Sequence, residues 1–236
     1  MNALGSDVWW RWDGIVLREP VFMSMLVSLL IVALALWVRR QTVPPGREPS
    51  ALMEAVYTMT RNAVAEVVPA QDVDSVLPFV GTLWLFIVLS NLLGLIPGLS
   101  SPTRDLSVTS ALAIIVFVAV HFYGVRAAGW AAYLKHYLSP NPILLPFHLV
   151  SEVTRTVALA VRLFGNMMSL QMAAVLILLV AGLLVPVPLL LLHVVEALVQ
   201  AYIFGMLALI YIASALEVSH DRLQSGGVST TDLPRD

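Results

Sequence analysis

The sequence predicts an all-α polytopic membrane protein with five transmembrane crossings, the last two being long tilted helices that form a hairpin. Composition is the first reason: of the 236 residues, 59% are hydrophobic and only 12% are charged, and the mean hydropathy is +0.87. A soluble domain carries about 25% charged residues. The second reason is a series of apolar stretches, each long enough for the roughly 20 residues that a helical crossing needs.

Residues 1–19 are expected to form an extracytoplasmic N-terminal segment. They contain Trp9, Trp10 and Trp12, and tryptophan favours the headgroup region of a bilayer because its ring is amphipathic. The segment is too polar for the apolar core of a cleavable signal peptide. At the other end of the chain, residues 217–236 are polar and are predicted to form a cytoplasmic tail.

The membrane domain is expected over residues 20–216. Its crossings are predicted at about 20–38, 76–97, 106–125, 149–184 and 187–216. Between the first two, residues 49–66 mix apolar side chains with Glu54 and Arg61, which predicts a short amphipathic helix on the cytoplasmic surface.

The orientation follows from the basic residues, since short cytoplasmic loops are enriched in Lys and Arg. A cytoplasmic position for the loops after the first, third and last crossings leaves only Arg11, Arg18 and Arg104 outside. The N-terminus is therefore predicted outside and the C-terminus in the cytoplasm.

The last two apolar stretches are longer than a perpendicular crossing requires, so each is predicted to be strongly tilted or broken. Gly182, Pro186 and Pro188 predict the turn that joins them. The chain has no cysteine, which excludes disulfides, thiolate metal sites and thiol nucleophiles.

Arg162 is the most informative residue, because it places a charge inside one of these stretches. A guanidinium cannot be deprotonated in a protein, and its cost near a bilayer centre is about 3 kcal/mol on insertion scales. No acidic residue lies within one helical turn of it. We interpret its partner as lying at least partly outside this chain, with a salt bridge to Glu196 as the alternative.

Polar residues form one stripe on each of the two long helices, given about 100° of rotation per residue. The first stripe comprises Glu152, Arg155, Arg162, Asn166 and Ser169, with Gln171 almost opposite. The second comprises His193, Glu196 and Gln200, with Tyr211 near the same face. Neither stripe is compatible with lipid, so together they predict a polar route between the helices.

Structural alternatives exist for several of these residues. Glu152 and Arg155 lie one turn apart, so a local ion pair or snorkelling to the membrane edge competes with a role in transport. For Asn166, the alternative to a role in transport is a hydrogen bond between packed helices. A lone histidine such as His193 is often structural, but its position beside Glu196 favours a polar pathway.

Several blocks of sequence carry a family resemblance. They are Ser151-Glu-Val-Thr-Arg155, Leu159-Ala-Val-Arg-Leu-Phe-Gly-Asn166, His193, Gln200-Ala-Tyr-Ile-Phe204, Pro102-Thr-Arg-Asp-Leu106 with Thr109, and Asn91-Leu-Leu-Gly-Leu-Ile-Pro97. In order and spacing, over about Phe79 to Glu217, they resemble subunit a of F-type ATP synthases.

The resemblance implies a non-catalytic stator beside a rotating ring of c subunits, each with one ion-binding carboxylate. Arg162 would attract that carboxylate as it sheds its ion and would repel a cation leaking between two half-channels. His193, Glu196 and Gln200 would line the half-channel open to the outside. Asn166 would lie beside the ring, and Glu152, Arg155 and Ser169 are candidates for the cytoplasmic side.

The implied partners are the c-subunit ring, the b-subunit peripheral stalk, the other synthase subunits and membrane lipid, in a bacterial inner membrane. The transported ion is H+ or Na+, because the choice depends on neighbours of the ring carboxylate that are absent from this chain. No cofactor, metal or nucleic acid is expected. The chain has no Gly-x-x-x-x-Gly-Lys-Ser/Thr loop, so ATP chemistry would belong to partner subunits.

The chain departs from the family pattern at three positions. Many members carry an acidic residue where His193 stands, some carry glutamate at Gln171, and proline is usual at Thr156. These departures concern the residue-by-residue route of the half-channels and not the role of Arg162.

Two other classes of function are compatible with the residues alone. A secondary transporter would use Arg162 as a site for a substrate anion. An intramembrane enzyme would use His193 and Glu196 as an acid/base pair, although no nucleophile or three-ligand metal cluster accompanies them.

Overall fold

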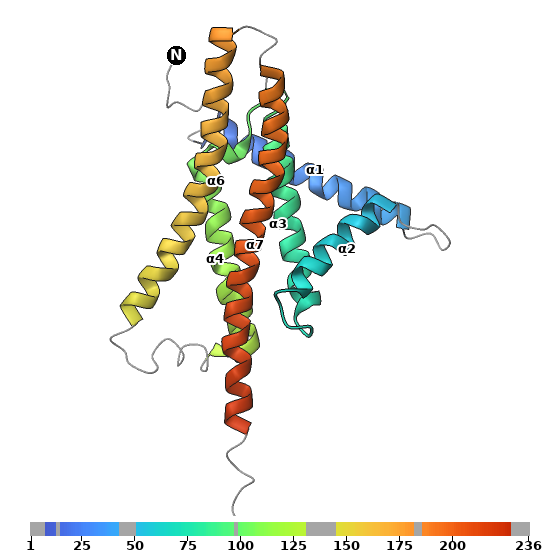
Figure 1. Ribbon diagram of the computed structural model, residues 1–236, viewed down its shortest axis with the longest axis vertical. Helices are drawn as coiled ribbons and strands as arrows, with labels where there is room; N and C mark the ends of the chain where they lie inside the picture. The colour runs from blue at the N-terminus through green and yellow to red at the C-terminus, as the bar shows by residue number, and fades with distance from the viewer. Residues whose placement is uncertain are drawn as a thin grey trace, which may run out of the picture.

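The computed structural model describes residues 8–12, 15–42, 51–96, 99–130, 145–181 and 186–227. Its elements are β1 (Val8–Trp12), β2 (Ile15–Arg18), α1 (Glu19–Thr42), α2 (Ala51–Ala65), α3 (Val73–Leu93), η1 (Pro102–Arg104), α4 (Leu106–Ala128), α6 (Leu145–Ala181) and α7 (Pro186–Gly227) (Figure 1). The protein is therefore predominantly helical, as predicted.

Four helical segments in the described part of the chain are long and apolar enough to cross a membrane. They are Glu19–Arg40, Val73–Leu93, Leu106–Ala127 and Leu190–Glu217. The prediction of a polytopic helical membrane protein is confirmed by these segments. The fifth crossing and the hairpin of the last two helices stay predictions.

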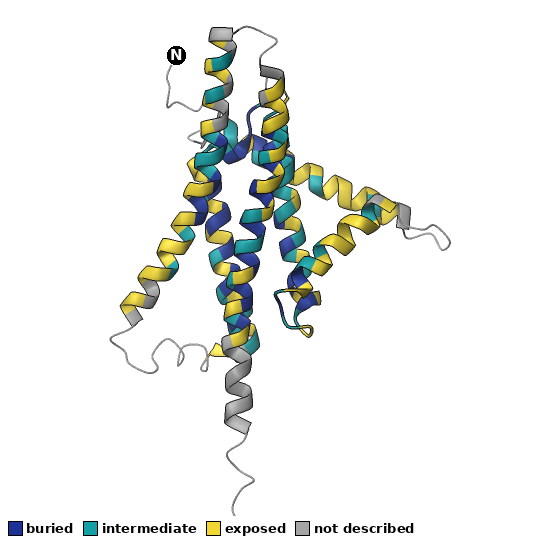
Figure 2. Ribbon diagram, in the orientation of Figure 1, coloured by how far each residue is buried: buried dark blue, intermediate teal, exposed yellow. Residues whose placement is uncertain are grey.

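The hydrophobic core lies where α3, α4, α6 and α7 face one another (Figure 2). α3 buries branched apolar side chains at helical spacing, namely Val73, Val76, Val80, Leu83 and Ile87. The facing side of α7 buries small residues about one turn apart, namely Ala197, Ala201, Gly205 and Ala208. Small residues allow helix backbones to approach closely, which accounts for the central position of α7.

Gly205 marks the tightest of these approaches. A Cβ atom at this position would lie 1.4 Å from Nε1 of Trp84 on α3, so only glycine leaves room for the indole. The same indole stacks on Tyr202, with ring centroids 6.1 Å apart. The ring of Trp84 is thereby held between two positions of α7 that are nearly one turn apart.

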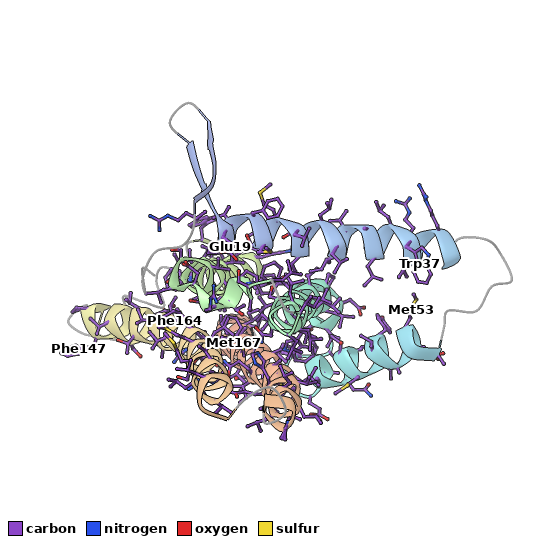
Figure 3. All side chains as sticks on the ribbon, turned by 90° about the horizontal axis from the view of Figure 1, so that it is seen from above. Glu19, Trp37, Met53, Phe147, Phe164 and Met167 are labelled. Atoms are coloured by element: carbon purple, nitrogen blue, oxygen red, sulfur yellow. The ribbon has the colours of Figure 1, made fainter. Side chains whose placement is uncertain are left out.

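α6 joins the bundle through its middle. Its buried residues include Leu159, Ala160, Leu163 and Met167. None of the described side chains before Leu159 is buried. In this first part α6 diverges from α7 (Figure 1), and Phe147 lies at its outer end, away from the other helices (Figure 3). We call residues 145–158 of α6, together with the part of α7 around Tyr211 that faces them, the α6–α7 fork.

α1 and α2 form an arm to one side of the bundle (Figures 1 and 3). α1 is attached at its first turns, where Met23 and Val27 are buried and Ser100 donates a hydrogen bond to the carboxylate of Glu19. Its remaining apolar side chains are largely exposed (Figure 2), up to Trp37 at the far end of the arm (Figure 3). α2 then leads back to the start of α3.

The N-terminal segment differs from the prediction of a purely helical chain, because β1 pairs with β2 in an antiparallel hairpin. Its strands are rich in valine, isoleucine and tryptophan, which favour extended backbone. The two residues between them in the sequence are Asp13-Gly14, a pair typical of tight hairpin turns.

α3 ends at Leu93, earlier than the predicted end at residue 97. Gly94 follows, and a Cβ atom there would lie 2.9 Å from Cβ of Ser101. The returning chain therefore packs directly against the end of the helix, at a position that only glycine fits.

The last helix also differs from the prediction at both ends. Pro186 and Pro188 lie in the first turn of α7 and not in the turn before it. Proline is tolerated there because the first N–H groups of a helix have no intrahelical acceptor. Gly182 lies outside the described residues. α7 runs on to Gly227, into the region predicted as a tail.

Candidate functional site

Arg162 lies in the middle of α6 with its side chain exposed, next to the buried Leu163. Within the described part of the chain, no carboxylate lies at ion-pair distance from its guanidinium. The alternative of a salt bridge to Glu196 is therefore not observed among these residues. The geometry is that of a permanent charge on the outer surface of an apolar helix, available to a group outside the chain.

Asn166 lies one turn beyond Arg162 and connects α6 to α7. Its Nδ2 donates a hydrogen bond of 2.6 Å to Oε1 of Gln200. Gln200 is only 1% exposed, so this bond lies inside the helix pair. Two residues from the two predicted polar stripes thus meet directly, close to Arg162 in the sequence of α6.

His193, Glu196 and Gln200 follow one side of α7, spaced at three and four residues. His193 is 9% exposed, and its Nε2, like Nε2 of Gln200, has no hydrogen-bond partner among the described residues. Glu196 lies between them, partly exposed, and forms no hydrogen bond with a described residue. Buried polar atoms are nearly always hydrogen-bonded. This side of α7 is therefore suited to receive polar groups that the described chain does not supply.

The cytoplasmic-side candidates are not all brought together. Arg155 places its guanidinium carbon 4.5 Å from the ring centroid of Tyr211 on α7. Glu152 is partly buried, and its backbone carbonyl accepts a hydrogen bond from Thr156. Ser169 is exposed, farther along α6. The side chain of Gln171 lies outside the described residues.

A buried polar network fastens α3 to α7 at the level of the α7 stripe. Nδ2 of Asn91 donates to the backbone carbonyl of Ala197, at 3.3 Å, and Asn91 is fully buried. Oδ1 of Asn91 accepts a hydrogen bond of 2.7 Å from Thr103. Ser101 lies 2.6 Å from Thr103 and donates to the carbonyl of Ser90 at 2.8 Å. The network therefore holds the residue next to Glu196.

This network was not predicted from the sequence, in which Asn91 and Thr103 were noted only as parts of motifs. Their burial could have been suspected from the cost of placing an asparagine near the end of an apolar crossing without a partner. The pairing with Ala197 could not, because a backbone carbonyl leaves no trace in the pattern of side chains.

The described residues contain no group of three or more His, Cys, Asp or Glu side chains that could hold a metal ion. What the site does contain is a surface cation on α6 and, beside it, an amide pair leading to a histidine and a glutamate on α7. Such groups can donate or accept protons and can replace part of the hydration shell of a cation.

Comparison with known proteins gives a consistent match. The family model described as ATP synthase A chain matches residues 21–213. ATP synthase subunit a 1 of Hahella chejuensis is 53% identical over 235 residues, which cover 99% of each chain. ATP synthase subunit a of Legionella pneumophila (strain Philadelphia 1) is 53% identical over 205 residues, 87% of each chain. ATP synthase subunit a 2 of Pelobacter propionicus is 59% identical over 191 residues, 80% of this chain and 83% of the relative.

The family model covers most of the chain, and the first of these relatives matches almost end to end. The resemblance that the motifs around Arg162 and Gln200 carried is thereby confirmed. This protein belongs to the ATP synthase subunit a family.

Proposed function

We propose that the protein is the ion-channel stator of the membrane sector of a rotary ATP synthase. It would provide two half-channels that pass ions to and from the carboxylates of a c-subunit ring, so that ion flow is coupled to rotation. The chain itself would be non-catalytic. The observation that carries the proposal is the exposed guanidinium of Arg162, without a carboxylate partner among the described residues.

A permanent cation on an apolar helix requires compensation from outside the chain, and a carboxylate on a neighbouring subunit supplies it. A nearby positive charge favours the ionised form of a carboxyl group, so Arg162 would promote release of the ion from each ring site. It would also repel cations that might pass straight from one half-channel to the other. Exposure on the side of α6, and not at a helix end, suits contact with a moving ring.

The outside half-channel would follow α7 past His193, Glu196 and Gln200. Support comes from the buried nitrogens of His193 and Gln200 that have no partner among the described residues. The Asn166–Gln200 bond would bring this route to the helix that carries Arg162. The cytoplasmic half-channel would begin on the opposite side of Arg162 along α6, toward Glu152 and Arg155, with Ser169 as a further candidate.

We further propose a bacterial inner-membrane location with the N-terminus outside and the C-terminus in the cytoplasm. The partners would be the c ring, the peripheral stalk and the other synthase subunits. The transported ion would be H+, with Na+ as the alternative. A requirement for sodium in ATP-driven transport by the assembled complex would decide between the two ions.

The test is Arg162→Ala in the complete complex reconstituted into vesicles. We expect loss of both ATP-driven ion transport and ion-driven ATP synthesis, with the subunit still assembled. Val161→Ala is the matched control, since Val161 is the exposed neighbour on the same helix and carries no charge. Coupled transport at the control rate in Arg162→Ala would overturn the proposal.

A second variant asks whether any positive charge suffices. Arg162→Lys should also be badly impaired, because lysine can lose its proton in a dry site and holds its charge at a single point. The assay is the same, and full activity of the lysine variant would show that a simple point charge performs the role assigned to the guanidinium.

A further inference from the structure

The contact between Arg155 and Tyr211 joins the two arms of the α6–α7 fork. The guanidinium carbon of Arg155 lies 4.5 Å from the centroid of the Tyr211 ring, within the range of a cation–π interaction. Arg155 is exposed and forms no ion pair with a described residue. Its charge is therefore held by the aromatic ring and not by a carboxylate of the described chain.

The two partners differ in how firmly they are anchored. Tyr211 is partly buried and packs against the hydrophobic core from α7. Arg155 belongs to the part of α6 that has no buried side chain among its described residues and that diverges from the bundle (Figure 1). The ring of Tyr211 thus provides a fixed point for a helix segment that lacks core packing of its own.

The hydroxyl of Tyr211 forms no hydrogen bond with a described residue. The interaction therefore depends on the ring face, which phenylalanine shares, and on the positive charge of the guanidinium. Replacing Tyr211 by phenylalanine therefore distinguishes this cation–π contact from a hydrogen bond, because phenylalanine keeps the ring and lacks the hydroxyl. It also means that the contact can be removed from either side without leaving a described polar group newly unsatisfied.

We propose that Tyr211 is a positioning residue that holds Arg155 and so sets the angle of the α6–α7 fork. The inference rests on the proposed function, in which this fork borders the cytoplasmic half-channel. Arg155 precedes Arg162 by seven residues, close to two helical turns, so both guanidinium groups lie on nearly the same side of α6. Fixing Arg155 against α7 keeps the second cation of this face in one place.

The functional consequence concerns the passage of ions along the fork. A guanidinium that moved freely on its long side chain would place its charge at changing distances from a passing cation. When the Arg155 guanidinium is held on the Tyr211 ring, its charge and the first part of α6 keep one position relative to α7. Loss of the ring should therefore slow transport without abolishing it, in contrast to loss of Arg162.

The test compares Tyr211→Leu, Tyr211→Phe and Arg155→Ala in the complete reconstituted complex, measured by ATP-driven transport. We expect Tyr211→Phe to retain transport and Tyr211→Leu to lower it roughly three- to tenfold, as expected for loss of one cation–π contact. Arg155→Ala should lower transport to a similar extent. In the double variant Arg155→Ala/Tyr211→Leu, the loss should be no greater than in either single variant. Ile210→Ala, at the exposed neighbouring position, is the control.

A distance measurement reports on the fork itself. The chain has no cysteine, so cysteines introduced at the exposed Thr154 and Ser214 are its only thiols and can carry two spin labels. Tyr211→Leu and Arg155→Ala should each broaden the distance distribution between the labels, whereas Tyr211→Phe should leave it unchanged. If the leucine variant does not assemble, Arg155→Ala still tests the contact, because it leaves the packing of α7 intact.

Wild-type transport and an unchanged distance distribution in Arg155→Ala would overturn the inference, as would strictly additive losses in the double variant. These outcomes are distinguishable from failure of the proposed function. If Arg162→Ala retains coupling, the stator role fails whatever Tyr211 does. If Arg162→Ala abolishes coupling while Tyr211→Leu transports at the wild-type rate, only the positioning role is excluded.

Discussion

Asn166 on α6 donates a hydrogen bond of 2.6 Å to the side-chain carbonyl of Gln200 on α7. The bond joins the two helices one turn from Arg162, and it lies at a position where Gln200 is closed to solvent. An amide pair inside an apolar interface is favourable only while both partners remain, because an unpaired buried amide loses its hydration without compensation.

We expect Asn166→Leu to lower the free energy of unfolding of the purified chain in mixed micelles by about 1–3 kcal/mol, since it leaves Oε1 of Gln200 unpaired. The double variant Asn166→Leu/Gln200→Leu should cost less than the sum of the single variants. Ser169→Ala, at an exposed position of the same helix, is the control. Additive costs would show that the two amides do not stabilise the protein as a pair.

Glu196→Gln should reduce ATP-driven ion transport in the reconstituted complex roughly tenfold or more, equivalent to at least about 1.4 kcal/mol of barrier. The amide keeps the shape of the side chain but cannot exchange a proton or carry a negative charge. Glu54→Gln, an exposed position on α2, is the matched control. Equal transport by the two variants would place the outside route on another face.

Gly205→Ala should destabilise the packing of α3 on α7, because the new Cβ would lie 1.4 Å from Nε1 of Trp84 and the indole must move. We expect a loss of about 1–3 kcal/mol in the unfolding of the purified chain, as for overpacked cores. A smaller side chain at Trp84 in the same variant should recover part of the loss.

Gly165→Ala is the matched control for this substitution. A Cβ at Gly165 meets no atom within 4 Å, and replacing glycine within a helix should stabilise the chain by about 0.5–1 kcal/mol. Equal effects of the two substitutions would show that the close approach of Trp84 is not what requires glycine at position 205.

Asn91→Leu should destabilise the purified chain by about 1–3 kcal/mol, because it leaves the Thr103 hydroxyl without the acceptor Oδ1 and removes the bond to the carbonyl of Ala197. Transport should fall as well, since α7 loses its attachment beside Glu196. Asn62→Leu, on the exposed face of α2, is the control. An unchanged free energy of unfolding in Asn91→Leu would show that the network does not attach α7 to α3.

The sequence predicted a largely helical chain with several helices long and apolar enough to cross a membrane, because long apolar stretches have few alternatives in a bilayer. It also placed Asn166 and Gln200 on polar stripes, because helical periodicity determines which residues share a face. It did not predict that these two side chains bond to each other. That pairing depends on the rotation and height of one helix against another, which local periodicity does not contain.

Three further features were not predicted from the sequence, for different reasons. The space that Gly205 leaves for the indole of Trp84 depends on shape complementarity between helices that are distant in the chain. The β1–β2 hairpin was missed because its short strands were interpreted only by their tryptophans, although Asp13-Gly14 was present as a turn signal. For Arg155 the sequence indicated a local ion pair with Glu152, snorkelling or a role in transport, and none of these points to its contact with Tyr211 on another helix.

Among the contacts that neighbouring helices make with α7 are the Asn91 hydrogen bond at Ala197 and the cation–π contact of Arg155 at Tyr211. The two points are fourteen residues apart, or about 21 Å along the helix axis. Attachment at two such points restrains α7 against translation along its axis and against rotation about it. A lateral force on α7 is therefore transmitted to α3 and α6, and α7 moves together with these two helices.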